Sequence, residues 1–424
     1  MTGGQQVVDA RLHPSYLQVL SEREFGGLFS ARMLSDWGDQ LTRVAIATLV
    51  LDRSGSALLA AVTFAISFLP AVFGQALLAP YADRLPRRTL LVICDLLRAL
   101  VVVLLVLAVT GQLPLVVVLG LLFSIELIGT PFYAATAALL TEIFPNRRQF
   151  LTASGLLSAT GQLNQVVGLA LGGLVVATLG TTKALWVDAA TFLVSAVLLG
   201  VFVRNRAAAT DLGAPSLGDL VRDMREGMAY LRGDIPLRWL IALAWVMILV
   251  LVAPEAIALP YAREHGQSPL VGGLLLAAVP LGAAVGVVLV NRWPPQVQVA
   301  RLLPLATLAP IPLLPMAVDP PWQVAAVLFA LSGCCSGYMV PLMGTFSLLA
   351  PDAMRGRLNG LAGSGFALAS VGALLVVGAS ADLTSPAMSV VLAASLTLLF
   401  LALTWRRWPH RAIQTAAARA YGAC

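Results

Sequence analysis

Charged residues are scarce in this sequence. Aspartate, glutamate, lysine and arginine make up 11% of its 424 residues, whereas an ordinary soluble domain carries roughly 25%. Apolar residues make up 59%, and the mean hydropathy is +0.87. A chain with so few charges cannot cover itself with a water-soluble surface, so the composition predicts an integral membrane protein.

The residues of common catalytic and nucleotide-binding motifs are also missing. Lys183, the only lysine, follows Thr182, so the sequence has no phosphate-binding loop that ends in a glycine-lysine pair. The three histidines fall in expected tails or loops, and the four cysteines contain no C-x-x-C pair. We therefore expect no ATPase, no other enzyme, no metal and no cofactor.

What the sequence does contain is a series of long apolar runs. They are continuously apolar rather than alternating, which favours helices over a β-barrel. Their lengths predict an all-α integral membrane protein with about twelve transmembrane helices. The expected spans are residues 27–51, 56–80, 89–110, 114–143, 150–178, 184–203, 236–261, 270–291, 300–318, 322–348, 358–380 and 386–405.

The basic residues indicate the topology. If the N-terminus is cytoplasmic, only Arg53, Lys183 and Arg263 among the 27 lysines and arginines fall outside, and most of the others fall on the inner side. This is the positive-inside bias of membrane proteins. It explains the formal net charge of +6 without a nucleic-acid partner. We expect a multi-pass protein of the cell membrane with both termini in the cytoplasm.

The longest internal connection, residues 204–235, separates two halves, 1–203 and 236–424. Its later part has apolar residues at helical spacing among charges, which predicts an amphipathic helix on the inner leaflet or a solvated linker helix. The segment LTASGLLSATGQL also resembles GRLNGLAGSGFAL, and the match brings Gly155 onto Gly360. An offset of about half the chain is typical of transporters built from two related halves.

The segment APYADRLPRRTLLVICDLLRAL lies between the second and third expected helices. It resembles the loop signature G-x-L-A-D-R-x-G-R-R of the major facilitator superfamily, with two glycines replaced. The resemblance implies two pseudo-symmetric six-helix bundles and a latch, in which an acidic residue binds a helix N-terminus in one conformation only. Alternatively, the arginines only follow the positive-inside bias. The latch residues would be Asp83, Arg84, Arg87 and Arg88, with Asp95 and Arg98 as nearby ion-pair partners.

Four charged residues share one stripe of the first expected helix: Arg32, Asp36, Asp39 and Arg43. The surrounding segment SDWGDQLTRVAIATLVLDRSGSALLA resembles the macrolide-exporter and enterobactin-exporter branch of the superfamily, through its G-D pair and its S-G-S. An isolated charge at mid-membrane costs about 2.5–3.5 kcal/mol, so the stripe should face a central cavity. It either forms an ion-pair ladder that fixes helix packing or carries protons, with Asp39 as the first candidate.

Two further carboxylates, Glu126 and Glu255, lie near the middle of expected helices without an adjacent basic residue. Desolvation favours the neutral form of such a group, so it can bind and release a proton. The alternative is a structural hydrogen bond. Asp188 and Glu142 are expected near helix ends, where interfacial solvation suffices.

The segment VVGLALGGLV resembles the antiporter signature G-P-x-x-G-G, with Leu169 in the proline position. The matching glycines are Gly168, Gly172 and Gly173. The resemblance implies antiport, but small residues also let helices pack closely, and the kink that the proline would introduce is missing.

These features together predict a transporter that works by alternating access. The leading hypothesis is proton-coupled efflux of small amphipathic molecules, drug-like or siderophore-like, by a monomer in the lipid bilayer. A facilitator or importer of the same fold is the first alternative, and a membrane receptor or scaffold that transports nothing is the second. Nothing in the residues fixes the substrate.

Overall fold

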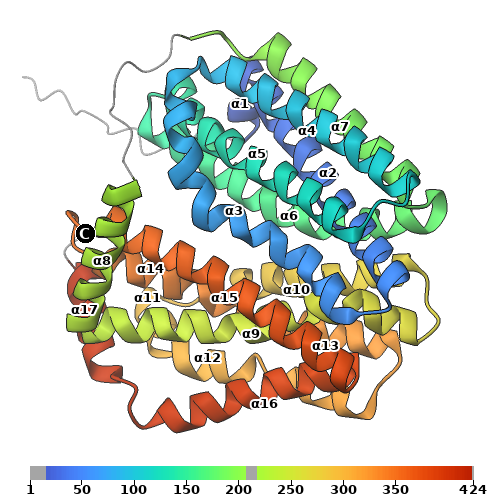
Figure 1. Cartoon of the computed structure of the whole chain (residues 1–424). Helices are drawn as coiled ribbons and strands as arrows, with labels where there is room; N and C mark the ends of the chain where they lie inside the picture. The colour runs from blue at the N-terminus through green and yellow to red at the C-terminus, as the bar shows by residue number, and fades with distance from the viewer. Residues whose placement is uncertain (1–15, 207–216, 423–424) are drawn as a thin grey trace, which may run out of the picture.

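The computed structural model describes residues 16–206 and 217–422. Within these ranges, the side chains of 71–84, 217, 219–221 and 420–422 are not described. Every regular element of the described chain is helical, and the helices form two bundles that are joined by one connecting helix (Figure 1).

The first bundle contains six long helices after the short α1 (Tyr16–Ser21). They are α2 (Arg23–Ser54), α3 (Ala57–Arg84), α4 (Arg87–Thr110), α5 (Leu115–Ile143), α6 (Arg147–Leu179) and α7 (Thr181–Phe202). The connecting helix is α8 (Leu217–Gly233). The chain leaves the first bundle at the end of α7 and enters the second at the start of α9. We name the end of the molecule where these two helix ends lie the linker end, and the opposite end the far end.

The second bundle begins with α9 (Ile235–Glu264) and α10 (Pro269–Val290). It ends with α15 (Arg355–Leu383), α16 (Pro386–Trp405) and α17 (His410–Gly422). The segments between are short: α11 (Pro295–Ala300), α12 (Leu302–Leu308), η1 (Ile311–Val318), α13 (Trp322–Cys335), η2 (Ser336–Tyr338) and α14 (Met339–Leu349).

The prediction of about twelve crossings is confirmed. Nine helical runs of the described chain are long and apolar enough to span a bilayer, and one of them, Trp322–Leu349, consists of α13, η2 and α14 in direct succession. The remaining crossings are α2, whose charged stripe lowers its hydropathy, and the shorter apolar segments Ala57–Pro70 and Leu302–Val318. An all-α membrane fold therefore follows from hydropathy alone.

The expectation of one continuous helix over 300–318 is wrong. The structure divides this crossing into α12 and the 3₁₀ helix η1, and the separate short helix α11 precedes it. The sequence LLPLATLAPIPLLP places four prolines within 12 residues. Each proline lacks an amide hydrogen and clashes with the preceding turn, so an unbroken α-helix cannot form there.

The connecting helix packs on protein. Leu231 is buried, and Met224 and Met228 pack against the main core cluster. Arg357 of α15 forms ion pairs with Asp223 at 3.0 Å and with Glu226 at 2.5 Å. Met224, Met228 and Leu231 of α8 thus pack on protein, and the contact of this helix with the inner leaflet stays a prediction.

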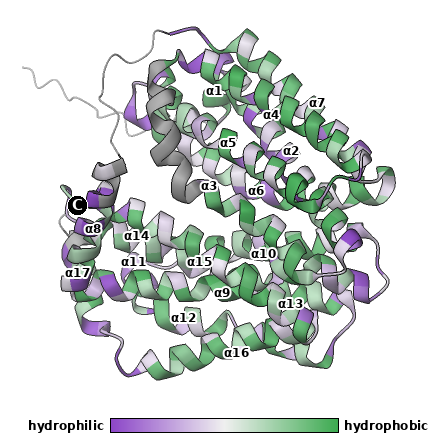
Figure 2. Ribbon diagram, viewed as in Figure 1, coloured by the Kyte–Doolittle hydropathy of each residue, from purple (hydrophilic) through white to green (hydrophobic). Residues whose placement is uncertain are grey.

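The outer surface of both bundles is apolar along most of the length of the helices, and polar residues gather at the ends (Figure 2). Leu107 is 59% exposed, Val197 63% and Leu403 68%. So many exposed aliphatic side chains would drive a soluble protein to aggregate. Hydrocarbon is the solvent that fits this surface.

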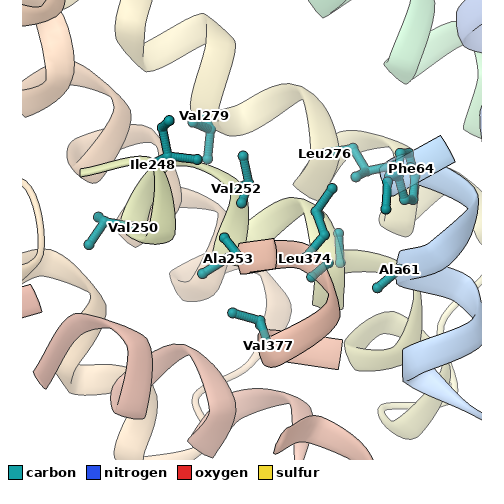
Figure 3. Packing of buried hydrophobic residues seen from close by; sticks show 14 of the residues in the cluster. Ala61, Phe64, Ile248, Val250, Val252, Ala253, Leu276, Val279, Leu374 and Val377 are labelled. Carbon is teal, nitrogen blue, oxygen red and sulfur yellow. The ribbon is translucent and has the colours of Figure 1, made fainter. Parts of the chain in front are cut away.

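The bundles meet along two pairs of helices, α3 with α15 and α6 with α10. The buried core is continuous across this interface: Ala61 and Phe64 of α3 lie in the same cluster as Leu276 of α10 and Leu374 of α15 (Figure 3). Most of this contact is between apolar surfaces. The buried charged side chains lie instead inside the first bundle.

Candidate functional site

The first bundle contains a cluster of charged side chains that we name the buried ionic network. They come from α2, α4, α5 and α7, and hydroxyl groups fill the spaces between them. The carboxylates are Asp36, Asp39, Asp95, Glu126 and Asp188, and the guanidinium groups are Arg32, Arg43 and Arg98.

Arg98 lies at the centre of the network and is completely buried. Its Nη2 donates to both carboxylate oxygens of Asp39, at 2.5 Å to Oδ2, and its Nη1 donates to Ser35 Oγ at 3.0 Å. Its guanidinium also lies 4.4 Å from the ring centroid of Phe192. A charge at this depth requires partners, and Arg98 has them at Nη1 and Nη2, while its Nε is a buried donor without a hydrogen-bond partner among the described residues.

Asp95 belongs to the same centre and is also completely buried. Its carboxylate is 3.9 Å from Arg98 Nη1 and accepts a hydrogen bond of 2.5 Å from Ser195 Oγ. The loop resemblance implied that Asp95 and Arg98, on the third expected helix, are nearby ion-pair partners of the latch. The structure places them inside the first bundle instead, because they face α2 and α7 from one side of α4.

Asp188 was expected near a helix end in contact with interfacial water. This expectation is wrong, because Asp188 is completely buried. Thr42 Oγ1 donates to Asp188 Oδ2, and Thr191 Oγ1 donates to Oδ1 at 3.3 Å. A Cβ atom on Gly38 would lie 2.0 Å from Asp188 Oδ1. The glycine of the G-D pair therefore makes room for this carboxylate against α2.

Glu126 forms an ion pair with a guanidinium group of another helix. Arg43 donates to it through two nitrogens, at 2.7 Å from Nε to Oε1 and 2.9 Å from Nη2 to Oε2. Ser67 Oγ donates to Oε1 at 2.8 Å. The expectation of a carboxylate without a basic neighbour is wrong, because its partner is on another helix, 83 positions away in sequence.

Only one rung of the expected ion-pair ladder lies within α2, the pair of Arg32 and Asp36 at 3.1 Å. Tyr133 of α5 joins this pair to the centre of the network: its hydroxyl donates to Asp36 at 3.1 Å and to Asp39 at 3.2 Å. Tyr133 was not among the site residues expected from the sequence. A polar aromatic residue two positions after Pro131, inside an apolar helix, was the signal that could have identified it.

Glu255 lies apart from the network, on α9 of the second bundle, between Pro254 and Ala256. It is half-buried. No hydrogen bond or ion pair joins it to another side chain that the structure describes. Its helix, α9, contacts α2, the helix that carries Arg43, across the interface between the bundles.

The described chain contains no group of three or more histidine, cysteine, aspartate or glutamate residues that could hold a metal ion. The arrangement places carboxylates, guanidinium groups and hydroxyl groups within hydrogen-bonding distance of one another inside the first bundle.

The family follows from a comparison with known proteins. The profile of the Major Facilitator Superfamily matches residues 28–374. The chain belongs to the major facilitator superfamily. This membership makes it a transporter of small molecules, in agreement with the twelve crossings and the two bundles.

Two of the similar proteins match the chain over most of its length, and a third matches about half of it. The multidrug efflux pump Tap of Mycolicibacterium fortuitum is 27% identical over 395 residues, which cover 88% of this chain and 92% of the pump. Macrolide efflux protein A of Streptococcus pyogenes is 24% identical over 219 residues, about half of each chain. The structure of the nucleoside transporter NupG has a TM-score of 0.70 at 11% identity, covering 95% of this chain and 99% of NupG.

The superfamily loop signature lies at the linker end. Arg87 Nε is 3.7 Å from Glu142 of α5, and Arg88 donates to the Gly200 carbonyl of α7. Both arginines thus contact the first bundle. The side chains of Asp83 and Arg84 lie outside the described residues, so the latch stays a prediction.

The antiporter-like glycines lie where α6 approaches other helices. A Cβ atom on Gly168 would lie 2.9 Å from Gln40, and one on Gly172 would lie 3.2 Å from Val44, both on α2. A Cβ atom on Gly173 would lie 2.8 Å from Gly273 Cα, on α10 of the other bundle. These glycines therefore allow close helix packing, and Gly173 does so between the bundles.

Proposed function

We propose that this transporter exports small amphipathic molecules, drug-like or siderophore-like, and that the proton gradient drives the export. The relatives named as multidrug and macrolide efflux proteins support the export of such compounds. Proton coupling rests on the residues of the ionic network and on Glu255.

The observation that carries proton coupling is an excess of carboxylates. The buried ionic network has five carboxylates and three guanidinium groups. If all were ionised, the interior of the first bundle would hold two uncompensated negative charges, which is costly in a medium of low dielectric constant. Bound protons remove this cost, so the network favours partial protonation.

Arg43 provides a means of coupling. It neutralises Glu126 in the present arrangement, and Glu255, like Asp188, has no ion-pair partner among the described residues. We propose that Glu255 is neutralised by a proton in one state and by a cationic group of the substrate in another. Competition for one carboxylate links the release of the proton to the binding of the substrate. Asp36 and Asp39 would relay the charge within the first bundle.

The positive-inside bias supports a cytoplasmic linker end, with both termini on that side. The two halves, 1–203 and 236–424, would then rock about the central site as units that the linker 204–235 joins, and one chain would suffice as a monomer. We also propose that the chain has no enzymatic activity of its own.

Transport by the purified protein in liposomes tests this proposal. A pH gradient is imposed, and the movement of the cationic dye ethidium and of a macrolide is followed. We expect gradient-driven flux, and we expect Glu255→Gln to lower it on the order of tenfold, the size of a typical coupling between linked sites. Glu264→Gln is the matched control, because Glu264 is an exposed residue at the far end of the same helix.

If the rate of transport by the unmodified protein is the same with and without the pH gradient, proton coupling is contradicted and a facilitator is favoured. Transport from the outer to the cytoplasmic side of the protein, the reverse of export, would favour an importer. The absence of any flux, together with binding of the same compounds, would favour a receptor.

A further inference from the structure

The turn between α2 and α3 lies at the far end and is held by the second bundle from two sides. Asp382, in the last turn of α15, accepts three hydrogen bonds from the start of α3. The donors are Ser56 Oγ at 2.5 Å, Ala57 N at 2.6 Å and Leu58 N at 3.2 Å. A carboxylate of one bundle thus caps a helix of the other.

Arg263, in the last turn of α9, makes the complementary contact. Its Nη1 donates to the Leu51 carbonyl at 2.5 Å and lies 3.7 Å from Asp52 Oδ1. Leu51 and Asp52 belong to the last turn of α2. A cation of the second bundle therefore binds the C-terminal end of a helix in the first.

The signs of the two charges match the helix ends that they bind. The amide groups that begin a helix carry partial positive charge, and the carbonyl groups that end it carry partial negative charge. Asp382 binds the positive end of α3, and Arg263 binds the negative end of α2. Gly55, at φ +67°, forms the left-handed cap of α2 and fixes the turn between these two ends.

These contacts depend on the present arrangement of the bundles. One turn before Asp382, a Cβ atom on Gly378 would lie 2.9 Å from Leu58 Cα and 2.8 Å from Ala61 Cβ. The helices α15 and α3 are therefore in direct contact at the far end. A transporter that opens at this end must separate them, so both polar contacts must break.

We propose that Asp382 and Arg263 form a two-point clamp on the turn between α2 and α3, and that the clamp sets how often the transporter opens at its far end. Both residues act by position and charge at the periphery, away from the ionic network. The clamp is a property of the conformational cycle and does not depend on what drives transport.

Distances between spin labels test the clamp. The label sites are Val116 and Val318, two residues at the far end that are 78% and 79% exposed. The four native cysteines are first replaced, and label distances are then measured in the purified full chain. We expect Asp382→Asn and Arg263→Gln each to raise the ratio of far-open to far-closed molecules about fivefold, the change for one lost helix cap.

Two control variants remove the same charges without touching the other bundle. Arg53→Gln affects the same turn, but Arg53 donates to carbonyls of Val109 and Leu113 within the first bundle. Asp319→Asn removes a far-end carboxylate that pairs with His265 within the second bundle. Both controls should leave the label distances unchanged.

Asp382→Glu keeps the carboxylate and should restore most of the closed population. An unchanged distance distribution in both clamp variants would overturn the proposal, as would an equal shift in the two controls. The labels report distances without a pH gradient, so failure of the clamp and failure of proton coupling give separate results.

Discussion

Replacing Arg98 by glutamine removes the central cation of the buried ionic network. Arg98 is completely buried and binds Asp39, whose side chain is 3% exposed, while Asp95 lies 3.9 Å away. The change leaves two buried carboxylates without their shared guanidinium. Loss of one partner of a buried ion pair costs about 3–5 kcal/mol, because the remaining charge stays desolvated.

A loss of this size lowers the midpoint of thermal unfolding on the order of 10 °C for a bundle of this length. The assay is thermal unfolding of the purified variant in detergent, followed by tryptophan fluorescence. Combining Arg98→Gln with Asp39→Asn should recover part of the loss, because two neutral amides can bond without a buried charge.

Arg222→Gln is the matched control for this prediction. Arg222 pairs with Glu226 on the exposed surface of α8 at 3.9 Å, and such pairs contribute about 0–1 kcal/mol. The reasoning is refuted if Arg98→Gln unfolds at the same temperature as the control, or if Asp39→Asn makes the variant less stable still.

The remaining predictions concern glycines at close helix contacts. Gly38→Ala should lower the unfolding midpoint, because the new methyl group would lie 2.0 Å from Asp188 Oδ1; Gly155→Ala, which meets nothing within 4 Å, should not. Gly173→Ala should widen the far-end label distances, because its methyl group would lie 2.7 Å from the Pro269 carbonyl oxygen of the other bundle. Unchanged midpoints or distances, relative to Gly155→Ala, would contradict these two predictions.

The crossings could be predicted from the sequence because the bilayer imposes a minimum length on every apolar run. The prediction of one continuous helix over 300–318 is wrong, because the prolines in this run interrupt the helix. The charged stripe of α2 was also visible in advance, because spacings of three and four residues place side chains on one helical face.

The pairing of these charges could not be predicted, because each partner comes from another helix. Arg98 is 59 positions from Asp39, and Glu126 is 83 positions from Arg43. Helical periodicity says which face a residue occupies but not which helix lies opposite. Asp188 was misjudged for the same reason: Gly38 of α2, far away in sequence, is what admits its side chain into the interior.

Two residues that break the positive-inside pattern have a structural explanation. Arg53 and Arg263 lie at the far end, where the topology predicts few basic residues. Each donates to carbonyl groups at or just beyond the end of a helix, Arg53 at α4 and Arg263 at α2. Their positive charges lie at helix ends where the carbonyl groups carry partial negative charge.

Proton release on substrate binding tests the central claim most directly. Ethidium or a macrolide is added to the purified transporter in weakly buffered detergent solution, and the pH change is compared with the amount bound. Proton-coupled export predicts that binding releases protons from the unmodified chain and that Glu255→Gln binds without this release. Binding of both compounds to the unmodified chain with no release of protons at any pH between 5 and 8 would contradict the account.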